Sequence, residues 1–271
     1  EIIISLTVMS GVLAVAAHFS VHQLRFLRSI TEMQSVRTQL GETSAIIAAV
    51  LANAHPAAGD ILVAEDTALE VRLTTGVSVV CAATPGRVVV PGAEESAALA
   101  VYSSVPQPGD RMDALFVDSA GSTWLSFSVA GSATTTERCG DVHPEIAPVA
   151  LTLVEPMTLS AGTPLRFTRP FRLSHYRSSD GVWYLGGRDW NGAQRRFNTV
   201  QPLAGPLLGR EGGAEDRGFA LRYVDSLGNE LSLPADPGRI ASVRVVVRAP
   251  RSSDGEPASH DSLVRIIVLR R

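Results

Sequence analysis

The chain begins with an almost unbroken run of apolar positions. Residues 2–19 carry no Asp, Glu, Lys or Arg, and about eighteen helical residues at ~1.5 Å each would cover most of the ~30 Å hydrocarbon core of a bilayer. This run predicts a helix whose first part, about residues 1–19, crosses a membrane. A cleaved secretory signal explains it less well, because the run passes directly into a second helical pattern instead of a cleavage site.

In the second pattern, apolar residues recur at steps of three, four or seven. They form one helical stripe, and Arg, Glu and Gln residues fill the positions between them. The stripe consists of Leu24, Leu27, Ile30, Met33, Val36, Leu40, Ile47, Val50 and Leu51. We therefore expect one continuous helix to about residue 53, amphipathic in its second half, and an N-terminal helical domain over residues 1–54.

Strand-like patterns begin after the turn at residues 55–60. Short apolar or alternating segments lie between Gly and Pro residues, and two pairs of them flank the hairpin signals DSAG (118–121) and SSDG (178–181). The expected strands are 61–64, 67–75, 77–81, 87–90, 114–117, 123–129, 171–176, 182–185, 219–224, 240–247 and 263–269, with a short helix possible at 93–100. The pattern predicts an α+β protein, in which the long helix precedes a mainly antiparallel β domain over residues 55–271.

Charge excludes one class of partner. The 271 residues include 24 basic and 27 acidic side chains, for a formal net charge of -3, so the chain lacks the positive field that holds nucleic acid. Every basic residue is Arg, and Arg72, Arg87, Arg111 and Arg166 are scattered along the sequence. This scatter is typical of solvated surface charge and predicts no nucleic-acid site.

Candidate catalytic chemistry is sparse. No HExxH, GxSxG or P-loop spacing occurs, and the two cysteines, Cys81 and Cys139, match no metal or redox motif. The tetrapeptide SHDS (259–262) places a nucleophile, a base and a carboxylate together, but neighbours in sequence rarely point at one another. It also adjoins the polar segment 250–257, which is typical of a loop. We expect no catalytic residue, no metal and no cofactor.

Residues 1–11, EIIISLTVMSG, resemble the N-terminal methylation motif of type IV pilins and pseudopilins, beginning at that family's glutamate. Later segments are similar in their order to the large W-type minor pilins and to the J-type pseudopilin of type II secretion. These segments are DGVWYLG (180–186), QPLAGPL (201–207), 219–225 with Gly228, 240–247 and 264–270.

The resemblance implies a minor pilin or pseudopilin subunit that assembles into, or initiates, a type IV pilus or a type II secretion-type filament. A carboxylate in hydrocarbon costs about 2.5–3.5 kcal/mol, so Glu1 is expected to pair with the α-amino group of a neighbouring subunit. The implied partners are other pilin or pseudopilin subunits, a prepilin peptidase that cuts upstream of Glu1, and the inner membrane.

The implied location is a single pass through the inner membrane with the β domain in the periplasm, and then a cell-surface or periplasmic filament. The alternative function is a membrane-anchored, exported β-rich module for binding or adhesion. The two differ in that only the pilin interpretation requires a basic leader ending in Gly ahead of the motif.

A location outside the cytoplasm also bears on the two cysteines. There, a disulfide between Cys81 and Cys139 is the natural pairing, and closing a loop of nearly sixty residues would stabilise the fold by about 4 kcal/mol. Two unrelated buried thiols remain the alternative.

Overall fold

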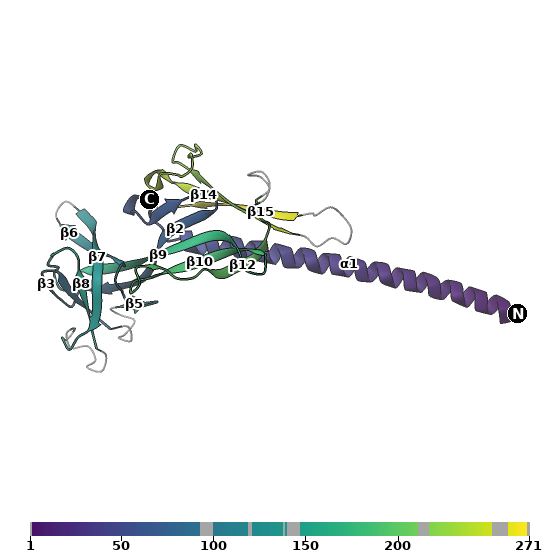
Figure 1. Ribbon diagram of the computed structural model, residues 1–271, viewed down its shortest axis with the longest axis horizontal. Coiled ribbons are helices and arrows are strands. Elements are labelled where there is room, and N and C mark those ends of the chain that lie inside the picture. Colours follow the sequence, from purple (N-terminus) through teal and green to yellow (C-terminus); the bar gives the residue numbers. More distant parts are fainter. Residues whose placement is uncertain are drawn as a thin grey trace.

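The computed structural model describes residues 2–92, 100–118, 121–137, 139, 147–210, 217–250 and 260–269. The side chains of residues 2–8, 10, 12–16 and 118 lie outside this set. One long helix leads into antiparallel sheets, and Figure 1 shows the first part of the helix extending well away from them.

The helix α1 (Ile2–Leu51) is continuous. No proline interrupts it before Pro56, which opens the short 3-10 helix η1 (Pro56–Ala58). The next residue, Gly59, has φ 73°, a left-handed conformation that glycine adopts without strain, and it turns the chain toward the first strand. The predicted helix end at about residue 53 is confirmed within two residues.

The strands form a larger and a smaller antiparallel sheet. The larger sheet has the order β1-β2-β9-β6-β7-β8-β4-β3, with β5 paired to β2, β10 paired to β9, and β11 and β12 paired to β10; the smaller sheet is β13-β14-β15. The bounds are β1 (Ile61–Ala64), β2 (Ala68–Val79), β3 (Ala82–Thr84), β4 (Arg87–Val90), β5 (Val101–Tyr102), β6 (Arg111–Asp118), β7 (Gly121–Thr134), β8 (Val149–Leu153), β9 (Pro164–Arg177), β10 (Trp183–Asn191), β11 (Arg196–Phe197), β12 (Gln201–Leu207), β13 (Phe219–Val224), β14 (Ser242–Pro250) and β15 (His260–Val268).

The predicted strands fall within these elements or end close to them. Both expected hairpins occur, as β6–β7 and β9–β10. The separate strands expected at 67–75 and 77–81 are one strand, β2, which carries a bulge between Thr74 and Gly76. The short helix considered at 93–100 lies outside the described residues, except for Ala100.

The expected α+β class is wrong. Strands account for 49 % of the residues and helix for 19 %, so the protein is mostly antiparallel β with one N-terminal helix. The sequence understated the strands because β3, β5, β8, β11 and β12 were not predicted, and because β7 and β9 extend beyond the segments expected for them. The expected transmembrane first half receives no support: within the described residues, no helix is long and apolar enough to cross a membrane.

Two apolar clusters form the core. The first, which we call the proximal core, joins the second part of α1 to the smaller sheet and to β1, β2, β9, β10 and β12. The second, the distal core, lies among β4, β6, β7, β8 and β9. Strand β9 contributes to both, with Leu173 in the proximal core and Leu165 and Phe167 in the distal core. This strand therefore connects the two halves of the β region.

Candidate functional site

The projecting part of α1 carries a concentration of exposed apolar side chains. Every side chain from Ala17 to Ser29 is exposed, and five of them are large and apolar. These five are Phe19, Val21, Leu24, Phe26 and Leu27, with 46–65 % of their surface exposed. Figure 1 shows this stretch of helix free of the sheets.

The apolar side chains of this stretch spread over more than half of the helix circumference. At about 100° per residue, Phe19 and Phe26 lie on one side, Leu27 lies between sides, and Val21 and Leu24 lie on the other, an arc of roughly 220°. The remaining arc is polar and is formed by His18, His22, Arg25 and Ser29. The apolar arc is wider than the roughly 100° stripe of a helix that packs on one surface. Along the predicted stripe, exposure begins to fall only at Ile30.

The second part of α1 is held firmly by the proximal core. Leu40, Ile47 and Leu51 are buried against it, and the helix packs on β2, β12, β14 and β15. Gln39 adds a polar contact, because its Nε2 donates a hydrogen bond to the carbonyl oxygen of Pro206 in β12. The β region thus fixes the direction in which the projecting part leaves it.

Glu1, the residue predicted to pair with a neighbouring subunit, lies outside the described residues. The same holds for most side chains of the predicted membrane segment. The role of Glu1 therefore stays a prediction.

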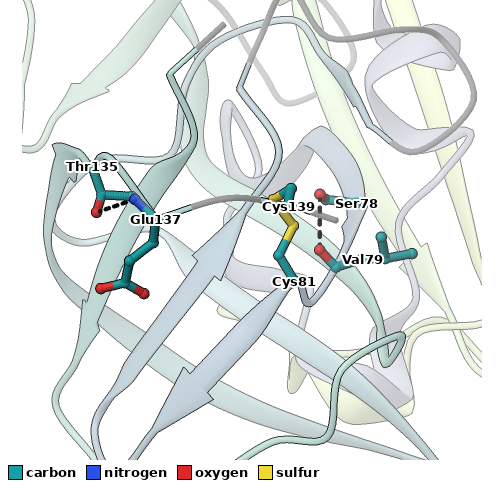
Figure 2. Close-up of a disulfide and its surroundings, with 6 residues drawn as sticks. All are labelled: Ser78, Val79, Cys81, Thr135, Glu137 and Cys139. Atoms are coloured by element: carbon teal, nitrogen blue, oxygen red, sulfur yellow. Dashed lines mark hydrogen bonds between the residues drawn. A yellow bond between two sulfur atoms is a disulfide. The ribbon is translucent and has the colours of Figure 1, made fainter. Parts of the chain in front are cut away.

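Cys81 and Cys139 form a disulfide (Figure 2). Their Cα atoms are 4.9 Å apart, within the usual range for such a bond, and 58 residues separate them in sequence. Cys81 follows β2, and Cys139 follows β7, so the bond ties the end of one sheet strand to the end of another beside the distal core. The structure therefore contains the disulfide and not the alternative of two separate thiols.

A network of buried charges links the end of the helix to the larger sheet. Asp60 is fully buried; it accepts hydrogen bonds from the guanidinium groups of Arg111 at 2.5 Å and Arg166 at 3.1 Å, and from the His55 backbone N–H at 3.1 Å. Both arginines also contact Asp113, whose side chain is 4 % exposed. Two carboxylates and two guanidinium groups balance each other, which is the condition for burying charges.

The prediction that Arg111 and Arg166 are solvated surface charges is therefore wrong. Their side chains are only 13 % and 18 % exposed. Arg72 lies nearby, and burial, with the neighbouring Arg111, lowers its pKa. The sequence offered one signal: these charged residues alternate with apolar ones inside strand-like segments, as in RMD (111–113). The sequence did not reveal their shared partner Asp60, which lies 51 residues before Arg111 and 106 residues before Arg166.

Most of the tetrapeptide SHDS (259–262), in which we expected no catalytic residue, lies in one strand. His260 begins β15, followed by Asp261 and Ser262 in the same extended strand, so successive side chains point to opposite faces. Ser259 lies outside the described residues. No group of three or more His, Cys, Asp or Glu residues in the described part could hold a metal ion.

His175 is a buried histidine, and neither of its ring nitrogens has a hydrogen-bond partner of normal geometry among the described residues. Its ring packs 4.7 Å from that of Trp183 and 6.2 Å from that of Phe219. Arg210 donates to its carbonyl oxygen at 2.7 Å and lies over the Trp183 ring. Burial, with a smaller contribution from Arg210, lowers the pKa of His175 to about 4.

This depressed pKa predicts acid sensitivity. The unfolded chain takes up the His175 proton near pH 6.5 and the folded chain only near pH 4, so the neutral ring stabilises the fold fully above pH 6.5. We expect that contribution to be lost as the pH falls from 6.5 to 4, by at most about 1.4 kcal/mol per pH unit. Urea denaturation of wild type and His175→Leu at several pH values measures it.

In this comparison, His175→Leu should show a shallower loss of stability over that pH range than wild type. A His260→Gln variant, changed at an exposed histidine, should keep the wild-type slope. Equal slopes for wild type and His175→Leu would contradict the assignment.

Comparison of the chain with protein-family models, with curated proteins and with solved structures gives no significant match.

Proposed function

We propose that this protein is a minor pilin or pseudopilin-like subunit, which assembles with related subunits through the projecting part of α1. The single observation that carries the proposal is the stretch 17–29, in which every side chain is exposed and large apolar residues occupy more than half of the helix circumference. Exposed apolar surface of this extent is characteristic of an interaction site. The EIIISLTVMSG opening supports the choice of family by resemblance.

The distribution of the apolar side chains favours several partners over one. A single partner helix would cover one stripe, as in a two-stranded coiled coil, and would leave the opposite side in water. Phe26 and Leu24 face different sides, so covering both requires neighbours on more than one side. A bundle of parallel helices at the centre of a filament meets this requirement.

The proposed location outside the cytoplasm agrees with the disulfide, since such bonds persist in oxidising compartments. In this proposal the β region lies in the periplasm, and the inner membrane, a prepilin peptidase and sibling subunits are the partners. Glu1 pairs with a neighbouring N-terminus. The second candidate function, an exported β-rich binding module, is favoured by the polar groove described in the next subsection.

The proposal predicts that polar residues in the projecting helix abolish assembly. The double variant Phe26→Ser, Leu27→Ser removes apolar side chains from two sides of the helix. We expect at least a tenfold lower fraction of the chain in filaments sheared from the cells that produce it. Immunoblotting of the sheared and cell-bound fractions measures this ratio.

A matched control changes the same helix at polar positions, Gln34→Ala and Ser35→Ala, and should assemble normally. Because Phe26 and Leu27 are exposed and belong to neither core cluster, both double variants should keep the wild-type thermal midpoint. Normal incorporation of Phe26→Ser, Leu27→Ser would rule out the projecting helix as the assembly surface.

A further inference from the structure

A groove of about 480 Å³ opens where β2, β9 and β10 meet the segment 103–107. Its volume is within the ~300–1,000 Å³ usual for small-molecule sites. Its lining is dominated by hydroxyl and amide side chains, among them Thr75, Ser103, Gln107 and Asn198, together with two aromatic rings, Phe171 and Trp190.

The groove's indole side chain is held in place by its neighbours. The Trp190 ring packs edge-on against Phe197, with 5.4 Å between the centroids, and Gln107 Nε2 donates to the Trp190 carbonyl oxygen at 3.1 Å. The indole Nε1 edge lies so close to Gly109 that a Cβ there would come within 2.4 Å of it. Gly109 also has φ 89°, a backbone conformation that other residues rarely adopt. Both the close approach and the backbone conformation therefore favour glycine at this position.

One hydrogen-bond donor in the groove wall has no partner among the described residues. This donor is the Thr75 hydroxyl; the residue is 8 % exposed, and although its carbonyl oxygen accepts from Ser103, its Oγ1 is unpaired. The Trp190 Nε1 is also unpaired, but it faces Gly109, which does not line the groove. Buried polar groups are nearly always hydrogen-bonded, so the Thr75 hydroxyl points to a ligand that supplies an acceptor.

The charges in the groove argue against an anionic ligand. Arg169 is the cation of the lining, and its charge is paired with Asp110: its Nε and Nη2 donate to the two carboxylate oxygens at 2.8 and 2.7 Å, and Nη2 also donates to the Val105 carbonyl at 3.0 Å. The Asp189 carboxylate is exposed and makes no ion pair within the described part of the chain. The groove thus presents a free negative charge and no free positive one.

We infer that this groove binds a neutral saccharide. Sugar hydroxyls both donate and accept, so they match the Asp189 carboxylate, the Asn198 and Gln107 amides, and the unpaired donor of Thr75. The apolar faces of Phe171 and Trp190 suit the C–H face of a sugar ring. The site lies on the β region and does not depend on assembly through α1.

The test begins with the full chain on an array of immobilised neutral mono- to tetrasaccharides. The soluble form of the strongest binder is then titrated into the full chain by isothermal calorimetry. We expect saturable binding, weakened about fivefold by Thr75→Val, because this change removes the unpaired donor while keeping the side chain's volume.

Thr168→Val is the matched control. Thr168 is also fully buried with an unpaired hydroxyl, but it does not line the groove, so its variant should bind the sugar like wild type. Thr75→Val should not lower the thermal midpoint, because it removes an unsatisfied buried hydroxyl. The inference is overturned if no neutral sugar binds, if charged sugars bind better, or if Thr75→Val binds as tightly as Thr168→Val.

Discussion

Replacing Asp60 with Asn should lower the free energy of unfolding by about 3–5 kcal/mol, because it leaves buried positive charge without its partner. The fully buried carboxylate accepts from both Arg111 and Arg166. Without it, two guanidinium groups share Asp113 alone, and the amide's NH₂ faces them as a second donor. Urea denaturation at pH 7 measures the loss.

The control is Glu137→Gln, which makes the same chemical change in the exposed ion pair with Arg87. Exposed pairs contribute little, so this variant should lose less than about 1 kcal/mol. If Asp60→Asn were no more destabilising than Glu137→Gln, the buried network could not be what joins the helix end to the sheet.

Removal of the disulfide should cost about 4 kcal/mol in the chain-entropy model, given the sequence separation of 58 between Cys81 and Cys139. The double variant Cys81→Ala, Cys139→Ala is compared with wild type by urea denaturation, with and without dithiothreitol. The reductant should shift the wild-type midpoint toward that of the variant.

The double variant is its own control, since dithiothreitol should leave its midpoint unchanged. We expect the loss of stability to be greatest in the distal core, beside which the disulfide lies. In the variant, amide hydrogen exchange should therefore become faster in β4 and β8 than in β13 and β14. A uniform rise in exchange across both cores, or no effect of reductant on wild type, would contradict this assignment.

Much of the fold could be predicted from hydrophobic patterns. Strands β1, β4 and β13 occupy the residues expected for them, since Gly, Pro or Asp residues bound each apolar run. Strand β12 was not predicted as a strand because it contains Pro202 and Pro206. It pairs with β10 only, and an edge strand tolerates proline.

The candidate sites were harder to predict, for a physical reason. The exposed helix could be predicted, since a long apolar run is visible in the sequence of a single element. The buried charges and the groove could not, because Asp60, Arg166 and Thr75 gain their neighbours through strand pairing far along the chain. Single charged or hydroxyl residues in a strand pattern look alike whether they face water or one another.

The long pairing of β2 with β9 has a mechanical consequence. Figure 1 shows β9, β10 and β12 running in roughly the same direction as α1, and the β2–β9 register extends from Ala68 with Ser174 to Val79 with Pro164. Tension applied through the helix reaches these strands in shear, which loads many hydrogen bonds at once instead of opening them one by one. A subunit of this shape would resist being pulled apart along its length far better than across it.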